Sequence, residues 1–240
     1  MDYKFKTEPY EHQLLALGAS HNKENFALFM EMGTGKSKVL VDNIAMLYDK
    51  GKINAALIIA PKGVYRNWER QEIPTHMPAH VMYNVMTWSP ATTKKQEAEN
   101  RKLFRHGEEL TIFLMNIEAF STKKGLDIAQ RFLLAHQTLM AIDESTTIKS
   151  PTASRTKNVL KLRDHAKYRR ILTGSPVTKS PLDLYTQCYF LDPLYLDFSS
   201  YYTFKNRYAM MVDRNVGSHS FKLVTGYIRL DELNSKLERF

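Results

Sequence analysis

The stretch MEMGTGKS, residues 30–37, places two glycines, a lysine and a serine between an apolar run and a segment with helical spacing. Gly33 and Gly35 let the backbone turn sharply and approach a ligand closely, because neither residue carries a Cβ atom. The N–H groups of such a turn, and those at the start of the following helix, attract anions. A lysine at position 36 can contact terminal phosphates, and a serine at position 37 can hold Mg²⁺. The pattern predicts a phosphate-binding loop made by Gly33, Thr34, Gly35, Lys36 and Ser37.

One residue of this stretch departs from the usual pattern. Met30 stands where such loops commonly begin with glycine. A chance turn in a basic protein is the alternative interpretation. The apolar run before the loop and the periodic segment after it favour phosphate binding.

An acidic pair, Asp143 and Glu144, follows the apolar run TLMAI. A phosphate-binding loop needs a carboxylate at the end of a nearby strand to organise Mg²⁺, and Asp143 fits that role. Glu144 could orient or deprotonate a water molecule for attack on a γ-phosphate. Taken alone, such a pair is more often a solvated helix start, and a small-molecule kinase could use the same Mg²⁺ site. The adjacent glutamate favours hydrolysis, and we expect the loop and the pair to meet across neighbouring strands.

A third apolar run, YRRIL, ends in the small polar turn TGSP, residues 173–176. Phosphate chemistry alone does not require this turn. The simplest interpretation is a helix cap, in which Ser175 or Ser180 caps a helix that begins near Pro181.

Apolar runs of strand length alternate along the chain with segments of helical spacing. This alternation predicts the α/β class, with a mainly parallel sheet covered by helices on both faces. The strand-like runs, each followed by its helical segment, are NFALFM and a helix from about Lys36, AALIIAP and VYRNWERQEI, HVMYNV and TKKQEAENRKLF, LTIFLMNI and GLDIAQRFLLA, QTLMAIDE and ASRTKNVLKLR, and YRRILTG and PLDLYTQCYFL.

The composition changes after Pro193, where an aromatic-rich segment begins. VDRNVGSHSFKLVTGY indicates a loop or a hairpin, and LDELNSKLERF a short helix. We expect one domain over residues 1–240, with residues 194–240 as an appendage packed on it.

The 240 residues carry a formal net charge of +9 and a pI of about 9.4. This charge suits a polyanion such as nucleic acid, or simply a soluble basic protein. No apolar run approaches the ~18 residues of a membrane span, and the mixed polar N-terminus resembles no export signal. The single cysteine, Cys188, has an apolar setting typical of buried packing in a reducing compartment. We therefore expect a cytoplasmic protein with no membrane partner.

The ordered motifs resemble a known family over nearly the whole chain. They are PYEHQ (9–13), MEMGTGKS (30–37), LIIAPKGVYRNWERQ (57–71), IFLMNIEAF (112–120), AIDESTTIKS (141–150) and ILTGSPVTKSPLDLYTQCYFLDP (171–193), followed by FKNRYA and VTGYIRLDELNSKLERF. This set resembles the N-terminal RecA-like lobe of superfamily-two helicases. It is most similar to the Swi/Snf-type double-stranded DNA translocases, in a phage-like or bacterial form.

The resemblance implies ATP and Mg²⁺ as cofactors and assigns roles to individual residues. Gln13 would contact the adenine edge, with Tyr10 near the base, although a surface position on an amphipathic helix is the alternative for Gln13. Phosphates and Mg²⁺ would be held by Lys36 and Ser37, Asp143 would coordinate Mg²⁺, and Glu144 would activate water. Coupling of the nucleotide state to DNA would fall to Thr146, Thr173 and Ser175, and DNA contact to the segments of Pro61, Lys62 and Asn116.

Two residues need separate comment under this resemblance. Thr146 stands where the family commonly has histidine. We therefore expect the motif AIDESTTIKS, which carries the acidic pair, to be coupled to the TGSP turn in an altered way. Trp68 lies in a DNA-lining block, but its large apolar area suits packing between a helix and the sheet better than base stacking.

The resemblance also implies double-stranded DNA and a second RecA-like lobe as partners. We expect that lobe in the same longer chain or in a separate one, and little or no hydrolysis without it. Alternatives are a strand-separating helicase or restriction-enzyme motor, a small-molecule P-loop kinase, and a non-catalytic nucleic-acid-binding module. The expected setting is the cytoplasm of a bacterium or of a phage-infected host.

Overall fold

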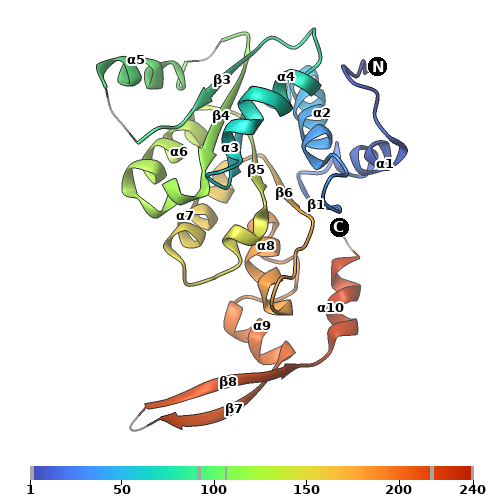
Figure 1. Cartoon of the computed structure of the whole chain (residues 1–240), viewed down its shortest axis with the longest axis vertical. Coiled ribbons are helices and arrows are strands. Elements are labelled where there is room, and N and C mark those ends of the chain that lie inside the picture. Colours follow the sequence, from blue (N-terminus) through green and yellow to red (C-terminus); the bar gives the residue numbers. More distant parts are fainter. Residues whose placement is uncertain (1–2, 91–92, 106, 217–218, 239–240) are drawn as a thin grey trace.

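The computed structural model describes residues 3–90, 93–105, 107–216 and 219–238 (Figure 1). In these residues six strands form one sheet in which every neighbouring pair is parallel. The strands lie in the order β1 (Asn25–Phe29), β6 (Tyr168–Thr173), β5 (Thr138–Asp143), β2 (Ala55–Ala60), β4 (Leu110–Asn116) and β3 (Tyr83–Thr87). The prediction of a mainly parallel α/β sheet is confirmed.

The central strand β2 is apolar throughout because both faces of the sheet are covered. In β2, Ala56 and Ile58 belong to one hydrophobic cluster, while Leu57 and Ile59 belong to a second cluster on the opposite face. Successive side chains of a strand point to opposite faces, so a continuous apolar run supplies both clusters.

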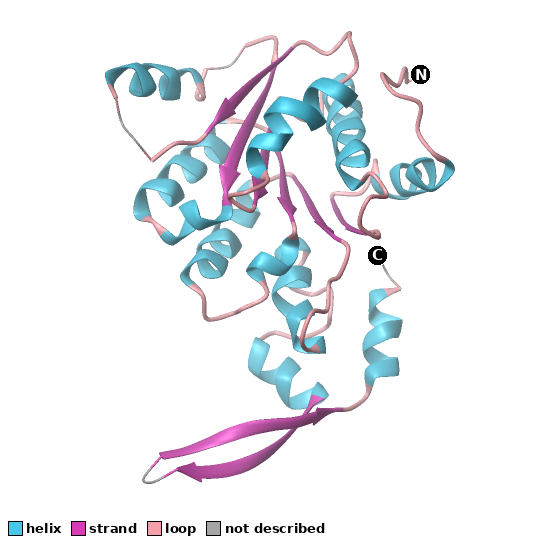
Figure 2. Cartoon of the chain, viewed as in Figure 1, coloured by secondary structure: helices cyan, strands magenta, loops and turns pink. Residues whose placement is uncertain are grey.

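Helices cover each face of the sheet (Figure 2). The first cluster includes residues of α2 and of the segment from α3 to α4, whereas the second includes residues of α6, α7 and α8. The bounds are α1 (Glu11–Ser20), α2 (Lys36–Asp49), α3 (Tyr65–Asn67), a π-helical turn η1 (Trp68–Glu72), α4 (Ile73–His76), α5 (Lys94–Lys102), α6 (Lys123–Ala135), α7 (Ser154–Leu162) and α8 (Leu184–Leu191). Short 3-10 turns are η2 (Ile117–Ser121), η3 (Ser145–Ile148), η4 (Arg163–His165) and η5 (Pro181–Asp183).

A buried arginine fixes α1 and the start of β1 against the sheet. The Arg170 side chain, on β6, is fully buried. Its guanidinium donates to the side-chain oxygen of Asn43 and to the carbonyl oxygens of Ser20, Lys23 and Glu24, at 2.7 to 2.9 Å. Burial lowers the pKa of Arg170 to about 9. These bonds tie the end of α1 and the residues before β1 to a fully buried guanidinium, so they help to set the position of α1.

The residues after Pro193 build a smaller unit from α9 (Tyr201–Tyr208), the antiparallel strands β7 (Ala209–Val216) and β8 (His219–Tyr227), and α10 (Leu230–Leu237). The hairpin and the short helix predicted here are confirmed, and residues 217–218 lie outside the described ranges. Helix α8 joins this unit to the sheet: Phe190 belongs to the second sheet cluster, whereas Tyr185 and Cys188 belong to the cluster of α9 and α10. In Figure 1 the hairpin projects beyond the ends toward which the sheet strands point.

Two smaller expectations can be compared with the structure. Cys188 is completely buried, as predicted, and burial raises the pKa of its thiol. Across the residues that the structure describes, no helix combines the length and the apolar character that crossing a membrane would require.

Candidate functional site

The three sequence segments singled out for chemistry end at the same edge of the sheet. Parallel strands bring their carboxyl ends together, and β1, β6 and β5 are adjacent in that order. In the register, Phe29 pairs with Thr173, and Asp143 pairs with Leu172. The expectation of neighbouring strands for the loop and the acidic pair is wrong, because β6 lies between β1 and β5. The TGSP turn therefore stands between the other two segments.

The loop after β1 has the backbone conformation that its glycines predict. Gly33 and Gly35 have φ angles of 78° and 81°, in the region that side chains with a Cβ rarely adopt. The backbone N–H of Val39 donates to the carbonyl of Gly35 at 3.2 Å, which begins α2. The amides ahead of Val39 at this helix start have no acceptor within the helix, so they are available to an anion.

Lys36 lies against its own loop. Its Nζ donates to the carbonyl oxygens of Met30 at 3.0 Å and Glu31 at 2.9 Å. Both acceptors are neutral, so the ammonium charge can pair with an incoming phosphate. At position 30 the interaction with Lys36 involves only the backbone carbonyl. The Met30 side chain packs on the first core cluster, and the backbone φ angle of Met30 is not positive. Methionine can therefore replace the usual glycine there.

The side chains of Thr34, in the loop, and of Gln13, on α1, both form hydrogen bonds to backbone carbonyls of the loop. The Thr34 hydroxyl donates to the carbonyl of Glu31 at 2.7 Å. Gln13 is 5% exposed; its Nε2 donates to the Thr34 carbonyl at 3.0 Å, and its Oε1 accepts from the Tyr10 backbone N–H at 3.0 Å. Gln13 is thus buried on the loop, and the interpretation as a surface residue is wrong. The Tyr10 ring is exposed and stacks on His12.

Asp143 is buried at the end of β5, and both of its carboxylate oxygens accept hydrogen bonds. Oδ1 accepts from the backbone N–H of Glu144, and Oδ2 accepts from the indole Nε1 of Trp68, each at 3.0 Å. Burial raises the pKa of Asp143, while the Trp68 bond, the Glu144 backbone and the Lys36 charge act in the opposite direction. Glu144 has a φ of 50°, an uncommon left-handed backbone conformation for a residue with a Cβ.

The TGSP turn contacts both other segments. The Thr173 hydroxyl donates to Oε2 of Glu144 at 3.4 Å, and it accepts from the backbone N–H of Ser175 at 3.2 Å. A Cβ on Gly174 would come within 3.0 Å of the Met32 side chain. The phosphate-binding loop, the acidic pair and the TGSP turn therefore form one site.

In the segment AIDESTTIKS (141–150), the hydroxyl that bonds to Gln187 of α8 belongs to Ser145 and not to Thr146. The buried Ser145 hydroxyl donates to Oε1 of Gln187 at 2.6 Å, and Gln187 Nε2 donates to the Pro176 carbonyl at 2.8 Å. The sequence carried a signal for Gln187, a polar residue within the apolar helix segment LYTQCYFL. A coupling role for Thr146 stays a prediction.

The cap proposed for the next helix is confirmed for one serine. Ser180 Oγ accepts from the backbone N–H of Leu182 at 3.0 Å, at the start of η5. Ser175 instead donates its backbone N–H to Thr173.

The candidate DNA residues follow β2 and β4 at the same edge. Pro61 and the exposed Lys62 come directly after β2. Asn116 ends β4 and is 7% exposed; its side-chain oxygen accepts from the backbone N–H of Ala119 at 2.9 Å. Asn116 therefore caps the following turn, and direct contact of its side chain with DNA stays a prediction. Trp68 is 1% exposed, which excludes base stacking in this conformation and confirms packing.

The side chains present fit Mg²⁺ bound to a nucleotide. Ser37 offers a hydroxyl and Asp143 a carboxylate, which are oxygen ligands of the kind that Mg²⁺ prefers. Within the described ranges, no three His, Cys, Asp or Glu side chains gather as a metal cluster. An ion at this site would take its other ligands from phosphate oxygens and water.

A family model described as the SNF2-related domain matches residues 10–239. The chain belongs to this family. Because this family model covers nearly the whole chain, the match excludes the alternative interpretation as a small-molecule P-loop kinase.

Curated relatives and a solved structure agree with this assignment. The chain is 28% identical over 176 residues to the chromatin-remodeling ATPase INO80 of Debaryomyces hansenii, covering 72% of this chain and 12% of that protein. It is 28% identical over 188 residues to the helicase SWR1 of Candida albicans, covering 77% of this chain and 11% of that protein. The Sulfolobus solfataricus SWI2/SNF2 ATPase core, solved in complex with double-stranded DNA, matches 87% of this chain and 40% of its own at a TM-score of 0.65 and 22% identity. The last likeness supports the RecA-like fold.

The two loop glycines make a matched pair of variants. Gly33→Ala places a Cβ in open space, whereas the Cβ of Gly35→Ala would lie 2.2 Å from Gln13 Nε2. Both variants incur about 1–2 kcal/mol of left-handed strain. We expect Gly35→Ala to lower the free energy of unfolding, measured by urea titration, by at least about 1 kcal/mol more than Gly33→Ala. Equal losses would contradict the close contact of Gln13 with the loop.

Proposed function

We propose that this chain is the nucleotide-binding RecA-like lobe of an ATP-dependent double-stranded DNA translocase, in which ATP hydrolysis drives movement along DNA. The observation that carries the proposal is the meeting of the loop around Lys36 with Asp143 and Glu144 at one edge of the sheet, with Thr173 between them. Membership of the SNF2-related domain family supports it.

The residues of the site divide the hydrolytic work. Lys36 and the loop amides bind the β- and γ-phosphates, and Gln13 contacts the adenine. Ser37 and Asp143 would hold Mg²⁺, which would supply charge neutralisation on the phosphate oxygens. The Glu144 carboxylate orients a water molecule and accepts its proton as the water oxygen attacks the γ-phosphorus, and the bond to the ADP oxygen breaks.

Thr173 and its turn would couple this chemistry to DNA. The Thr173 hydroxyl contacts Glu144, and Ser175 is tied to Thr173. A change in Glu144 on hydrolysis would therefore move residues 173–176, and through Gln187 would affect α8. We propose that Ser145 also takes part in coupling the nucleotide state to DNA, and we keep this role for Thr146.

Duplex DNA would lie along the edge formed by the loops after β2 and β4. Pro61 and Lys62 precede α3, and Asn116 shapes the turn after β4. The net charge of +9 favours contact with a phosphate backbone. A helicase is the second candidate, because the similar protein of Candida albicans is named helicase SWR1.

The proposal includes the wider organisation of the protein. Residues 1–240 would be one RecA-like lobe, with residues 194–240 as an appendage on α8. A second RecA-like lobe, in the same longer chain or in trans, would supply arginine groups that contribute ~10³–10⁵-fold in rate. This chain alone would hydrolyse ATP slowly or not at all. The expected setting of the protein is the cytoplasm of a bacterium or of a phage-infected host.

Replacing the loop lysine tests the nucleotide site. Lys36→Ala should weaken the binding of Mg²⁺ and a non-hydrolysable ATP analogue by about 10- to 100-fold, because a charge-assisted contact with phosphate is lost. Calorimetric titration measures the affinity. Lys161→Ala, an exposed site on α7, is the control and should bind as the original chain does. Unchanged affinity in Lys36→Ala would favour the non-catalytic nucleic-acid-binding module.

Salt dependence tests the contact with DNA. Anisotropy of a labelled duplex should report weak binding whose log Kd rises linearly with log salt concentration, by about 0.9 per phosphate contacted. Lys62→Ala should reduce that slope by about one contact, and Lys161→Ala should leave it unchanged. Equal binding at low and high salt would contradict contact with the phosphate backbone.

A further inference from the structure

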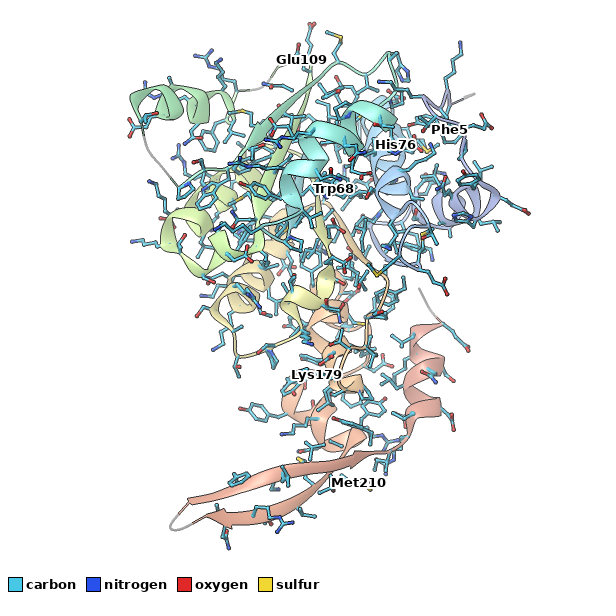
Figure 3. The ribbon with its side chains drawn as sticks, in the orientation of Figure 1. Phe5, Trp68, His76, Glu109, Lys179 and Met210 are labelled. Atoms are coloured by element: carbon cyan, nitrogen blue, oxygen red, sulfur yellow. The ribbon has the colours of Figure 1, made fainter. Side chains whose placement is uncertain are left out.

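The indole of Trp68 holds a buried carboxylate 75 positions away in the sequence. Trp68 lies in η1, on the first face of the sheet, and its Nε1 donates to Asp143 Oδ2 at 3.0 Å. In Figure 3 the residue is labelled where the ribbon of α3 and η1 crosses the sheet. Packing alone would be satisfied by any large apolar ring, so the hydrogen bond is the feature that requires tryptophan.

This bond completes the set of donors on Asp143. The backbone N–H of Glu144 holds Oδ1, and the indole holds Oδ2. With one donor on each oxygen, the plane of the carboxylate is fixed. Donors of this kind orient a metal ligand and favour its charged form, which a cation requires.

The backbone that carries Trp68 is tied to the loop after β2. The N–H groups of Val64 and Tyr65 donate to the Pro61 carbonyl at 2.8 and 3.0 Å, and Asn67 donates to Val64 at 2.8 Å. Trp68 then begins the π-helical turn, whose wide bond runs from the Ile73 N–H to the Trp68 carbonyl. Such turns occur frequently at functional sites. A shift of the Pro61 loop would therefore move the indole.

We propose that Trp68 is a positioning residue: it orients Asp143 toward Mg²⁺ and links the loop of Pro61 and Lys62 to the metal site. The inference rests on the proposed function, because Asp143 must bind the ion and Lys62 must contact DNA. It adds a residue that touches neither the nucleotide nor the DNA.

The two tryptophans of the chain provide a matched test. Trp88 is also buried, 7% exposed, but it packs in the second cluster on the opposite face. Trp68→Phe keeps a large ring and removes the N–H. The measurement is a Mg²⁺ titration of the binding of a fluorescent, non-hydrolysable ATP analogue.

Trp68→Phe should require about 10- to 100-fold more Mg²⁺ for half-maximal binding, and Trp88→Phe should stay within about twofold of the original chain. An unchanged Mg²⁺ requirement in Trp68→Phe would overturn the inference while leaving the proposed function intact. If the original chain bound no Mg²⁺–nucleotide at all, the proposed function itself would fail.

A second measurement does not depend on the folding of Trp68→Phe. In Trp88→Phe protein, Trp68 is the sole tryptophan, so its emission reports on Asp143 directly. Mg²⁺ with the ATP analogue should change that emission more than the analogue alone. Identical spectra with and without Mg²⁺, under conditions where the analogue binds, would overturn the inference.

The proposed link between Trp68 and the loop of Pro61 and Lys62 can be tested in the same Trp88→Phe protein. Binding of a DNA duplex should also change the emission of Trp68, and the additional substitution Lys62→Ala should reduce this change. A duplex that binds, by anisotropy, without altering the emission would contradict the link.

Discussion

A single buried carboxylate organises the candidate site. Asp143 ends a strand that is covered on both faces, so its charge has little contact with water and burial raises its pKa. The charged form persists only if donors replace the lost water. Two donors do so: one comes from the next residue, and the other crosses from the helix over the first face. Because the second donor is distant in sequence, the site depends on the packing of the whole lobe.

The order of the strands explains why the other groups converge on this carboxylate. Strand β6 lies between β1 and β5, so Thr173 stands between the phosphate-binding loop and the acidic pair. Arg170 on the same strand fixes the helix that carries Gln13, because its guanidinium holds the carbonyls at the end of α1 and before β1. On the other side, Gln187 connects Ser145 to the TGSP turn and to α8. Strand β6 and helices α1 and α8 therefore position Thr173, Gln13 and Ser145, whereas Trp68 of η1 holds Asp143.

The sequence predicted the elements better than it predicted their contacts. The apolar runs and glycine spacing gave the strands and the loop, since these depend on local periodicity and on the missing Cβ of Gly33 and Gly35. The position of β6 was not predicted, because strand order is set by crossover connections that leave no local pattern. The Trp68 bond to Asp143 was missed for the same reason: the residues lie 75 positions apart, and tryptophan resembles ordinary packing. The burial of Gln13 and the role of Ser145 likewise depend on long-range partners.

The central claim is that the loop after β1 and the acidic end of β5 serve one metal–nucleotide complex. The most direct measurement is anomalous diffraction from crystals grown with Mn²⁺ in place of Mg²⁺ and a non-hydrolysable ATP analogue. The account predicts a metal peak between the Ser37 hydroxyl and the Asp143 carboxylate, with the terminal phosphates against Lys36. A metal peak away from β5, with the phosphates bound outside the Gly33–Ser37 loop, would contradict it.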